Sequence, residues 1–143
     1  MKYPLSIVAA FIWIGFVCAI SFMESWLKFR AAGVTTSIGL NIGKIIFGTL
    51  NKMEWVFLIA IFSELIFKKV SMMNMLTLVL FIPLIILILQ SFWLLPVLNE
   101  RADLLIQRKT PESSHIHFVY VGIEVIKIAS LFLFGFYLLK EKI

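Results

Sequence analysis

The apolar positions of this chain fall into four long runs that are separated by short polar segments. We place the membrane-spanning parts of these runs at residues 4–26, 44–67, 72–98 and 115–139. About 20 apolar residues in a helix are enough to cross a bilayer, and a helix satisfies its own backbone polar groups in lipid. The pattern predicts an all-α fold, an integral membrane bundle of four transmembrane helices that forms one domain over residues 1–143.

Composition supports lipid as the solvent. Hydrophobic residues make up 62% of the chain, charged residues only 15%, and the mean hydropathy is +1.03, whereas a soluble domain carries roughly 25% charged residues. The formal charge of +5 does not indicate nucleic-acid binding, because the basic residues flank the apolar runs instead of forming a patch. We therefore expect the lipid bilayer as the partner surface and no nucleic acid.

The second run is longer than a bilayer requires. A helix from Ile38 to Phe67 would be roughly 45 Å long, against about 30 Å of hydrocarbon. We expect its first turns to project from the membrane, or the helix to tilt or kink near Gly48. Thr36 or Ser37 is the expected cap.

The third run is expected to end near Leu98, helped by Pro96, and to kink at Pro83. The polar stretch 99–114 then serves as a connection. Within it, residues 110–112 (Thr-Pro-Glu) are typical of a helix start and predict the beginning of the fourth helix.

The first run resembles a signal peptide, since Lys2 precedes an apolar stretch. No small-residue cleavage pattern follows it, so we interpret it as a retained first helix. The lone cysteine, Cys18, lies inside this run and is expected to be a small buried side chain.

Four spans place both termini on the same side, here named side B, and the first and third connections on the other, side A. Five basic residues fall on each side, so the positive-inside rule does not decide the orientation. The amino terminus and the Lys68–Lys69 pair favour side B as the cytoplasmic face of an inner membrane.

Polar side chains within the runs gather toward side A and follow helical spacing on the second and fourth helices. Because charged groups facing lipid are costly, such stripes should face the bundle interior. We hypothesise a polar cavity that opens to side A and is walled by helices one, two and four. Its candidate residues are Glu24, Asn41, Lys44, Asn51, Lys52, Glu54, His117, Tyr120, Glu124 and Lys127.

A purely structural role is the alternative. Glu124 and Lys127 could pair with each other, or Glu124 with Lys52 and Lys127 with Glu24 or Glu54. Such pairs would only hold the helices in register.

Other motifs are less specific. Gly39 and Gly43 form a G-x-x-x-G pattern that permits close helix approach. His115 and His117 are two positions apart on one helix, so they point in different directions and do not chelate one metal. The sequence predicts no cofactor and no metal site, and it names no catalytic residue.

Several short segments together resemble small four-pass bacterial integral membrane proteins of no established activity. The resemblance covers nearly the whole chain and implies a four-helix membrane fold without a mechanism. The segments are 24–29 (ESWLKF), 39–44 (GLNIGK), Asn51 with Glu54, and His117, Phe118, Tyr120, Glu124 and Lys127.

Three functional hypotheses follow from the sequence. In the first, the protein binds or passes a polar solute, ion or proton through the side-A cavity, with an oligomer needed for passage. In the second, it is an accessory or scaffold subunit of a larger membrane complex. In the third, it is a membrane-embedded enzyme that acts on lipid or quinone, with Glu124 or Glu24 as acid or base.

Overall fold

The computed structural model describes residues 2–110 and 115–141, and these form an all-α four-helix bundle. Each of the four helices is long and apolar enough to cross a membrane, so the predicted fold is confirmed. The first and third helices are composite and contain π-helical segments. The elements are α1 (Pro4–Val17), η1 (Cys18–Glu24), α2 (Ser25–Leu27), η2 (Lys28–Arg30), α3 (Thr36–Phe67), α4 (Met75–Leu89), η3 (Gln90–Leu94), α5 (Leu95–Ile106) and α6 (Ile116–Lys140).

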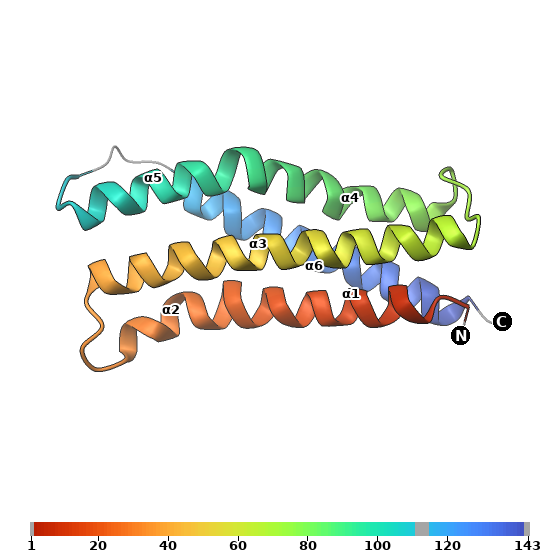
Figure 1. Cartoon of the computed structure of the whole chain (residues 1–143), viewed down its shortest axis with the longest axis horizontal. Helices are drawn as coiled ribbons and strands as arrows, with labels where there is room; N and C mark the ends of the chain where they lie inside the picture. The colour runs from red at the N-terminus through yellow and green to blue at the C-terminus, as the bar shows by residue number, and fades with distance from the viewer. Residues whose placement is uncertain (1, 111–114, 142–143) are drawn as a thin grey trace.

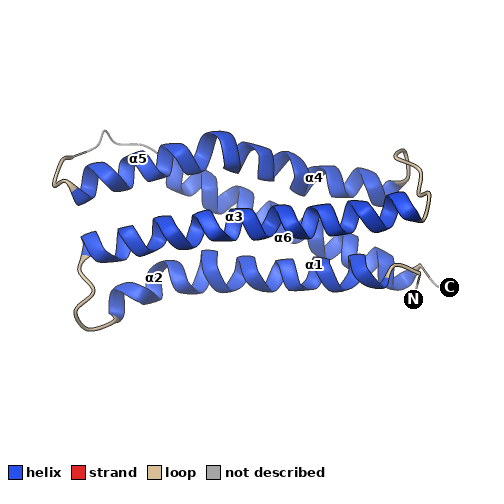
Figure 2. Cartoon of the chain, in the orientation of Figure 1, coloured by secondary structure: helices blue, strands red, loops and turns tan. Residues whose placement is uncertain are grey.

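The helices run side by side along the long axis of the molecule, and both chain ends lie at the same end of the bundle (Figure 1). The first connection, the end of α5 and the start of α6 lie at the opposite end, side A. Helix α1 packs against α3 and α6, α4 packs against α6, and α5 packs against α3. Short loops join the first helix to α3 and α3 to α4 (Figure 2).

The apolar core runs from the middle of the bundle toward side B. It includes Trp13, Ile61, Leu80 and Leu131, all at most 1% exposed. Many large apolar side chains instead face outward, as Phe92 does at 78% exposed. An apolar exterior of this extent is expected of a bundle whose solvent is lipid.

The third helix is longer than the sequence indicated. It continues without a break to Ile106, so residues 99–106 are helical and the prediction of an end near Leu98 was wrong. Pro96 falls in the first turn of α5, directly after the π-helical η3. A proline lacks an N–H donor, and the change of hydrogen-bond pattern at the end of a π segment accommodates that loss. Helix α4 also stays α-helical through Pro83.

Helix α3 is one continuous helix of 32 residues that passes through Gly48. Its cap is Thr35, whose hydroxyl accepts a 3.2 Å hydrogen bond from the Ile38 N–H, and not Thr36 or Ser37 as expected. Cys18 is exposed on the outer surface, contrary to the buried position expected for it.

The predicted start of the fourth helix at 110–112 lies mostly outside the described residues, because only Thr110 of the three is described. Helix α6 itself begins at Ile116.

Candidate functional site

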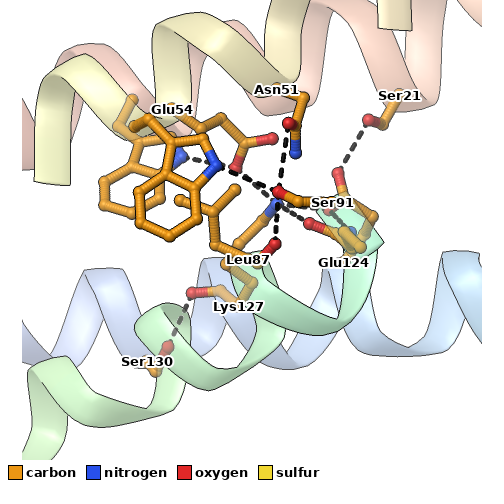
Figure 3. A network of polar contacts seen from close by, with 11 residues as sticks. Ser21, Asn51, Glu54, Leu87, Ser91, Glu124, Lys127 and Ser130 are labelled. Carbon is orange, nitrogen blue, oxygen red and sulfur yellow. Dashed lines mark hydrogen bonds and ion pairs between the residues drawn. The ribbon is translucent and has the colours of Figure 1, made fainter. Parts of the chain in front are cut away.

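Two carboxyl groups and one ammonium group meet in the middle of the bundle. Lys127 Nζ lies 2.5 Å from Glu124 Oε1 and forms a second ion pair with Glu54 Oε2. The three side chains are at most 1% exposed. Glu54 comes from α3, whereas Glu124 and Lys127 lie on neighbouring turns of α6, as Figure 3 shows. We call these three residues the buried ion cluster.

Neutral polar side chains from the other helices complete the hydrogen bonding of this cluster. Trp13 Nε1 donates to Glu54 Oε2 at 2.7 Å. The Gln90 side chain accepts from Lys127 at 2.7 Å and donates to Glu124. Buried charges are tolerated when they are paired and hydrogen-bonded in this way, and all four long helices contribute to it.

The hydroxyl of Ser21 lies on the opposite side of Glu124. Ser21 Oγ donates a 2.7 Å hydrogen bond to Glu124 Oε2, as Figure 3 shows. Glu124 is thereby held by Ser21 through one oxygen and by Lys127 and Gln90 through the other.

Both partners of Glu124 from the first and third helices lie in π-helical segments. Ser21 belongs to η1 and Gln90 to η3. π-Helical turns are rare and occur frequently at functional sites, because the extra residue changes which side chains face inward. Two such segments on different helices therefore supply side chains to one carboxyl group.

A cavity of about 570 Å³ lies between the side-A parts of all four long helices. Its polar lining includes Ser21 and Ser25 from the first helix, Lys44 from α3, and Tyr120 and Glu124 from α6. Glu124 is the lining residue of α6 that lies farthest from the side-A start of that helix. The cavity and the buried ion cluster thus meet at this residue.

The cavity walls are largely aromatic and aliphatic. They include Phe22, Trp26, Phe47 and Leu95, and the Phe47 ring lies edge-on to Tyr120 with centroids 5.8 Å apart. The lining therefore combines apolar walls with a polar inner end.

The charged groups near the opening are paired. Lys28 Nζ lies 3.3 Å from Glu24 Oε2, and Lys44 forms an ion pair with Asp103 of α5. His117 also lines the cavity and is exposed. Opposite charges therefore offset one another among the residues that lie nearest side A.

Four of the candidate residues predicted from the sequence line the cavity, namely Lys44, His117, Tyr120 and Glu124. Glu54 and Lys127 lie directly behind Glu124 in the buried ion cluster. The structure therefore places four of these six along the cavity and two in the buried ion cluster at its inner end.

The remaining four candidates lie elsewhere. Asn41 and Lys52 are exposed and do not line the cavity. The Asn51 side chain instead accepts a 3.1 Å hydrogen bond from Ser91, so it joins α3 to η3. Glu24 is half-buried and pairs with Lys28 on its own helix.

The sequence-based set omitted several residues that contact the cluster. Gln90 had a visible signal, since it is a polar residue in an apolar run. Ser21 and Trp13 had none, because a single hydroxyl or indole is common in apolar helices and only the packing shows what it faces.

The G-x-x-x-G pattern on α3 is a contact surface for the end of the first helix. A Cβ added at Gly39 would overlap the Phe29 ring, and one at Gly43 would lie 3.0 Å from Lys28 Nζ. These two glycines also line the cavity. The absence of side chains at both positions therefore lets the end of the first helix pack directly against α3 and form one wall of the cavity.

Comparison with protein-family models, curated proteins and solved structures finds no match to this chain. Within the described part of the chain, no group of three or more His, Cys, Asp or Glu side chains is placed to hold a metal ion. The four apolar helices are those of a small multi-pass membrane protein.

Proposed function

We propose that this membrane protein binds a polar solute or ion in the side-A cavity, with Glu124 as the group that contacts it at the inner end. One observation carries the proposal: the cavity ends at a carboxyl group that two π-helical segments and a buried ion pair hold in place. A buried charged residue inside a bundle marks a functional site by default, because its insertion is costly.

The cavity supports binding of a solute or ion more directly than its transport across the membrane by a single chain. Between the buried ion cluster and side B, the interior continues with large apolar side chains. These include Leu58, Ile61, Leu80, Leu131 and Phe134. An ion moving on from Glu124 would meet a low-dielectric barrier there, so passage would require a second copy or a larger complex.

The lining also indicates the kind of solute. Aromatic walls such as Phe22 and Trp26 suit an apolar body, whereas Ser21, Tyr120 and Glu124 offer hydrogen-bonding groups at the inner end. A small molecule with a polar head and an apolar body meets both requirements.

The test is to fill the cavity and ask whether a bound molecule is lost. Ala102 lines the cavity, whereas Ala129 on α6 is exposed and does not. Native mass spectrometry of protein purified from membranes into nanodiscs should find a small molecule on the wild type and on Ala129→Trp, but not on Ala102→Trp.

The matched pair makes the result specific, because both variants add the same bulky side chain. Equal occupancy in Ala102→Trp and Ala129→Trp, or no bound molecule in the wild type, would contradict the proposed function.

A further inference from the structure

The buried ion cluster is not balanced in charge. Glu54 and Glu124 carry two negative charges when both are ionised, and Lys127 carries one positive charge, which leaves an excess of one negative charge. All three side chains are at most 1% exposed. An unpaired charge in a low-dielectric interior is unfavourable, so a cation or a proton is expected to neutralise the cluster.

The groups that face the cluster from neighbouring helices do not supply the missing charge. Trp13 from α1, Ser21 from η1 and Gln90 from η3 are neutral hydrogen-bonding partners. Tyr120 is a neutral phenol on the same helix as Glu124 and is buried.

The two lysines that line the cavity already have acidic partners outside the cluster. Lys28 pairs with Glu24, and Lys44 pairs with Asp103. His117 is exposed at the start of α6, two turns before Glu124.

Lys127 also occupies the place that a bound cation would need. An ammonium group has three N–H donors, and Lys127 directs them to Glu54, Glu124 and Gln90. A cation between the two carboxyl groups would therefore have to displace this ammonium group. A proton needs no coordination shell and fits this arrangement.

We propose that the buried ion cluster holds one exchangeable proton on its two carboxyl groups, and that Glu124 exchanges it with the cavity. The proton count follows from the charges alone. The route rests on the proposed function, because it uses the cavity that opens to side A.

Ser21 connects the buried ion cluster to the cavity. Its hydroxyl lies 2.7 Å from Glu124 Oε2 and also lines the cavity, and a hydroxyl both donates and accepts. In the exchange, the Ser21 hydroxyl first turns its hydrogen from Glu124 Oε2 toward the cavity, so that Ser21 Oγ accepts from the protonated carboxyl. The O–H bond of the Glu124 carboxyl then breaks and its proton passes to Ser21 Oγ. The original Ser21 proton moves to a water or solute base in the cavity. The cluster becomes one unit more negative and the base one unit more positive, so charge is conserved.

Infrared spectroscopy of the protein in lipid vesicles at neutral pH counts protonated carboxyl groups from their carbonyl stretching band. We expect Glu54→Gln and Glu124→Gln each to remove one protonated carboxyl relative to the wild type, because one remaining carboxylate balances Lys127. Lys127→Gln should add one, since two carboxyl groups then lack a cation. Glu100→Gln, at an exposed position of α5, should leave the band unchanged.

The wild type alone can overturn the proposal, even if a variant fails to fold. A spectrum without a protonated carboxyl band at neutral pH would show that the cluster is fully ionised. An unchanged band in correctly folded Glu54→Gln and Glu124→Gln would lead to the same conclusion.

The route is tested separately by the rate at which this band shifts after transfer into D₂O. We expect Ala102→Trp and Ser21→Ala to slow the shift, and Ala129→Trp to leave it at the wild-type rate. One protonated carboxyl with an unaffected rate in Ala102→Trp would overturn the cavity route and weigh against the proposed function. The proton site itself would stand.

Discussion

The hydroxyl of Ser21 and the carboxyl group of Glu124 are joined by a 2.7 Å hydrogen bond, although 103 positions separate the two residues in the chain. This bond links the π-helical segment of the first helix to the last helix at the inner end of the cavity. Both residues line the cavity, so the bond joins the buried ion cluster to the cavity wall.

The strength of this bond is measurable by a double-mutant cycle. We expect Ser21→Ala to lower the free energy of unfolding by about 1 kcal/mol, because Glu124 loses a hydrogen-bond donor. The coupling between Ser21→Ala and Glu124→Gln should be of similar size. Ser63→Ala is the matched control, since its hydroxyl donates to the Ala60 carbonyl on its own helix. Equal effects of the two alanine variants would contradict a specific role for Ser21.

Removal of the buried ammonium should be much more damaging than removal of an exposed one. Lys127→Met leaves Glu54 and Glu124 without a cation, and we expect it to lower the free energy of unfolding by about 3 kcal/mol. Lys140→Met, at the exposed end of α6, should have little effect. Unfolding in mixed micelles with increasing denaturing detergent provides the measurement. A Lys127→Met protein as stable as Lys140→Met would show that the ion pairs contribute nothing.

Water should reach the cavity but not the outer face of α6. In a Cys18→Ala background, we expect Ser25→Cys to react rapidly with a charged, membrane-impermeant thiol reagent in opened vesicles. Ala129→Cys should react slowly, because Ala129 is exposed to lipid and Ser25 lines the cavity. Similar rates at both positions would mean that the cavity is closed to water.

The same variant tests the predicted orientation. If side B is cytoplasmic, Ser25→Cys should react when the reagent is applied to the outside of intact cells. Labelling that requires broken cells would place side A in the cytoplasm.

Glu64 stabilises the opposite end of the bundle by capping a different helix. Its carboxylate accepts hydrogen bonds from the backbone N–H groups of Ser6, at 2.6 Å, and Leu5, at 3.3 Å, in the first turn of α1. A negative charge is favoured at a helix N-terminus, so Glu64→Gln should cost about 1 kcal/mol. Hydrogen exchange at the Leu5 and Ser6 amides should speed up. Unchanged exchange at both amides would contradict the capping role.

Close packing at Gly39 should be visible in a comparison of two glycines on α3. We expect Gly39→Ala to displace the Phe29 ring and to lower stability by about 1 kcal/mol through overpacking. Gly48→Ala should be tolerated, because nothing lies within 4 Å of a Cβ added there. Thermal unfolding in detergent would compare the two variants. A fully stable Gly39→Ala would show that the ring moves aside without strain.

The helical architecture could be predicted from the sequence because, in lipid, the backbone must satisfy its own hydrogen-bonding groups. Apolar runs of this length must satisfy their own polar groups, so four runs predict four helices. The stripe that contains Tyr120, Glu124 and Lys127 also predicted which face of α6 turns inward, since charged side chains avoid lipid. Tyr120 is 5% exposed and the other two are fully buried.

The sequence was less informative about which side chains contact one another, because several arrangements of the ion pairs fit the same helical spacing. It left open whether Lys127 pairs with Glu124, Glu54 or Glu24, and the structure pairs it with the first two. It placed Lys52 in the polar cavity, yet this side chain is exposed. A long lysine near the end of a polar arc can extend outward as easily as inward, so helical spacing alone does not decide its position.

The sequence by itself determined the fold class, the four apolar helices and the inward face of α6, because each of these depends on local hydrophobicity and helical period. Only the tertiary structure decided that Ser21 and Gln90 reach Glu124 and that the cavity ends there. Those contacts depend on the π-helical turns, which change the direction in which the side chains of a helix point. No short-range pattern of residues predicts where such a turn occurs.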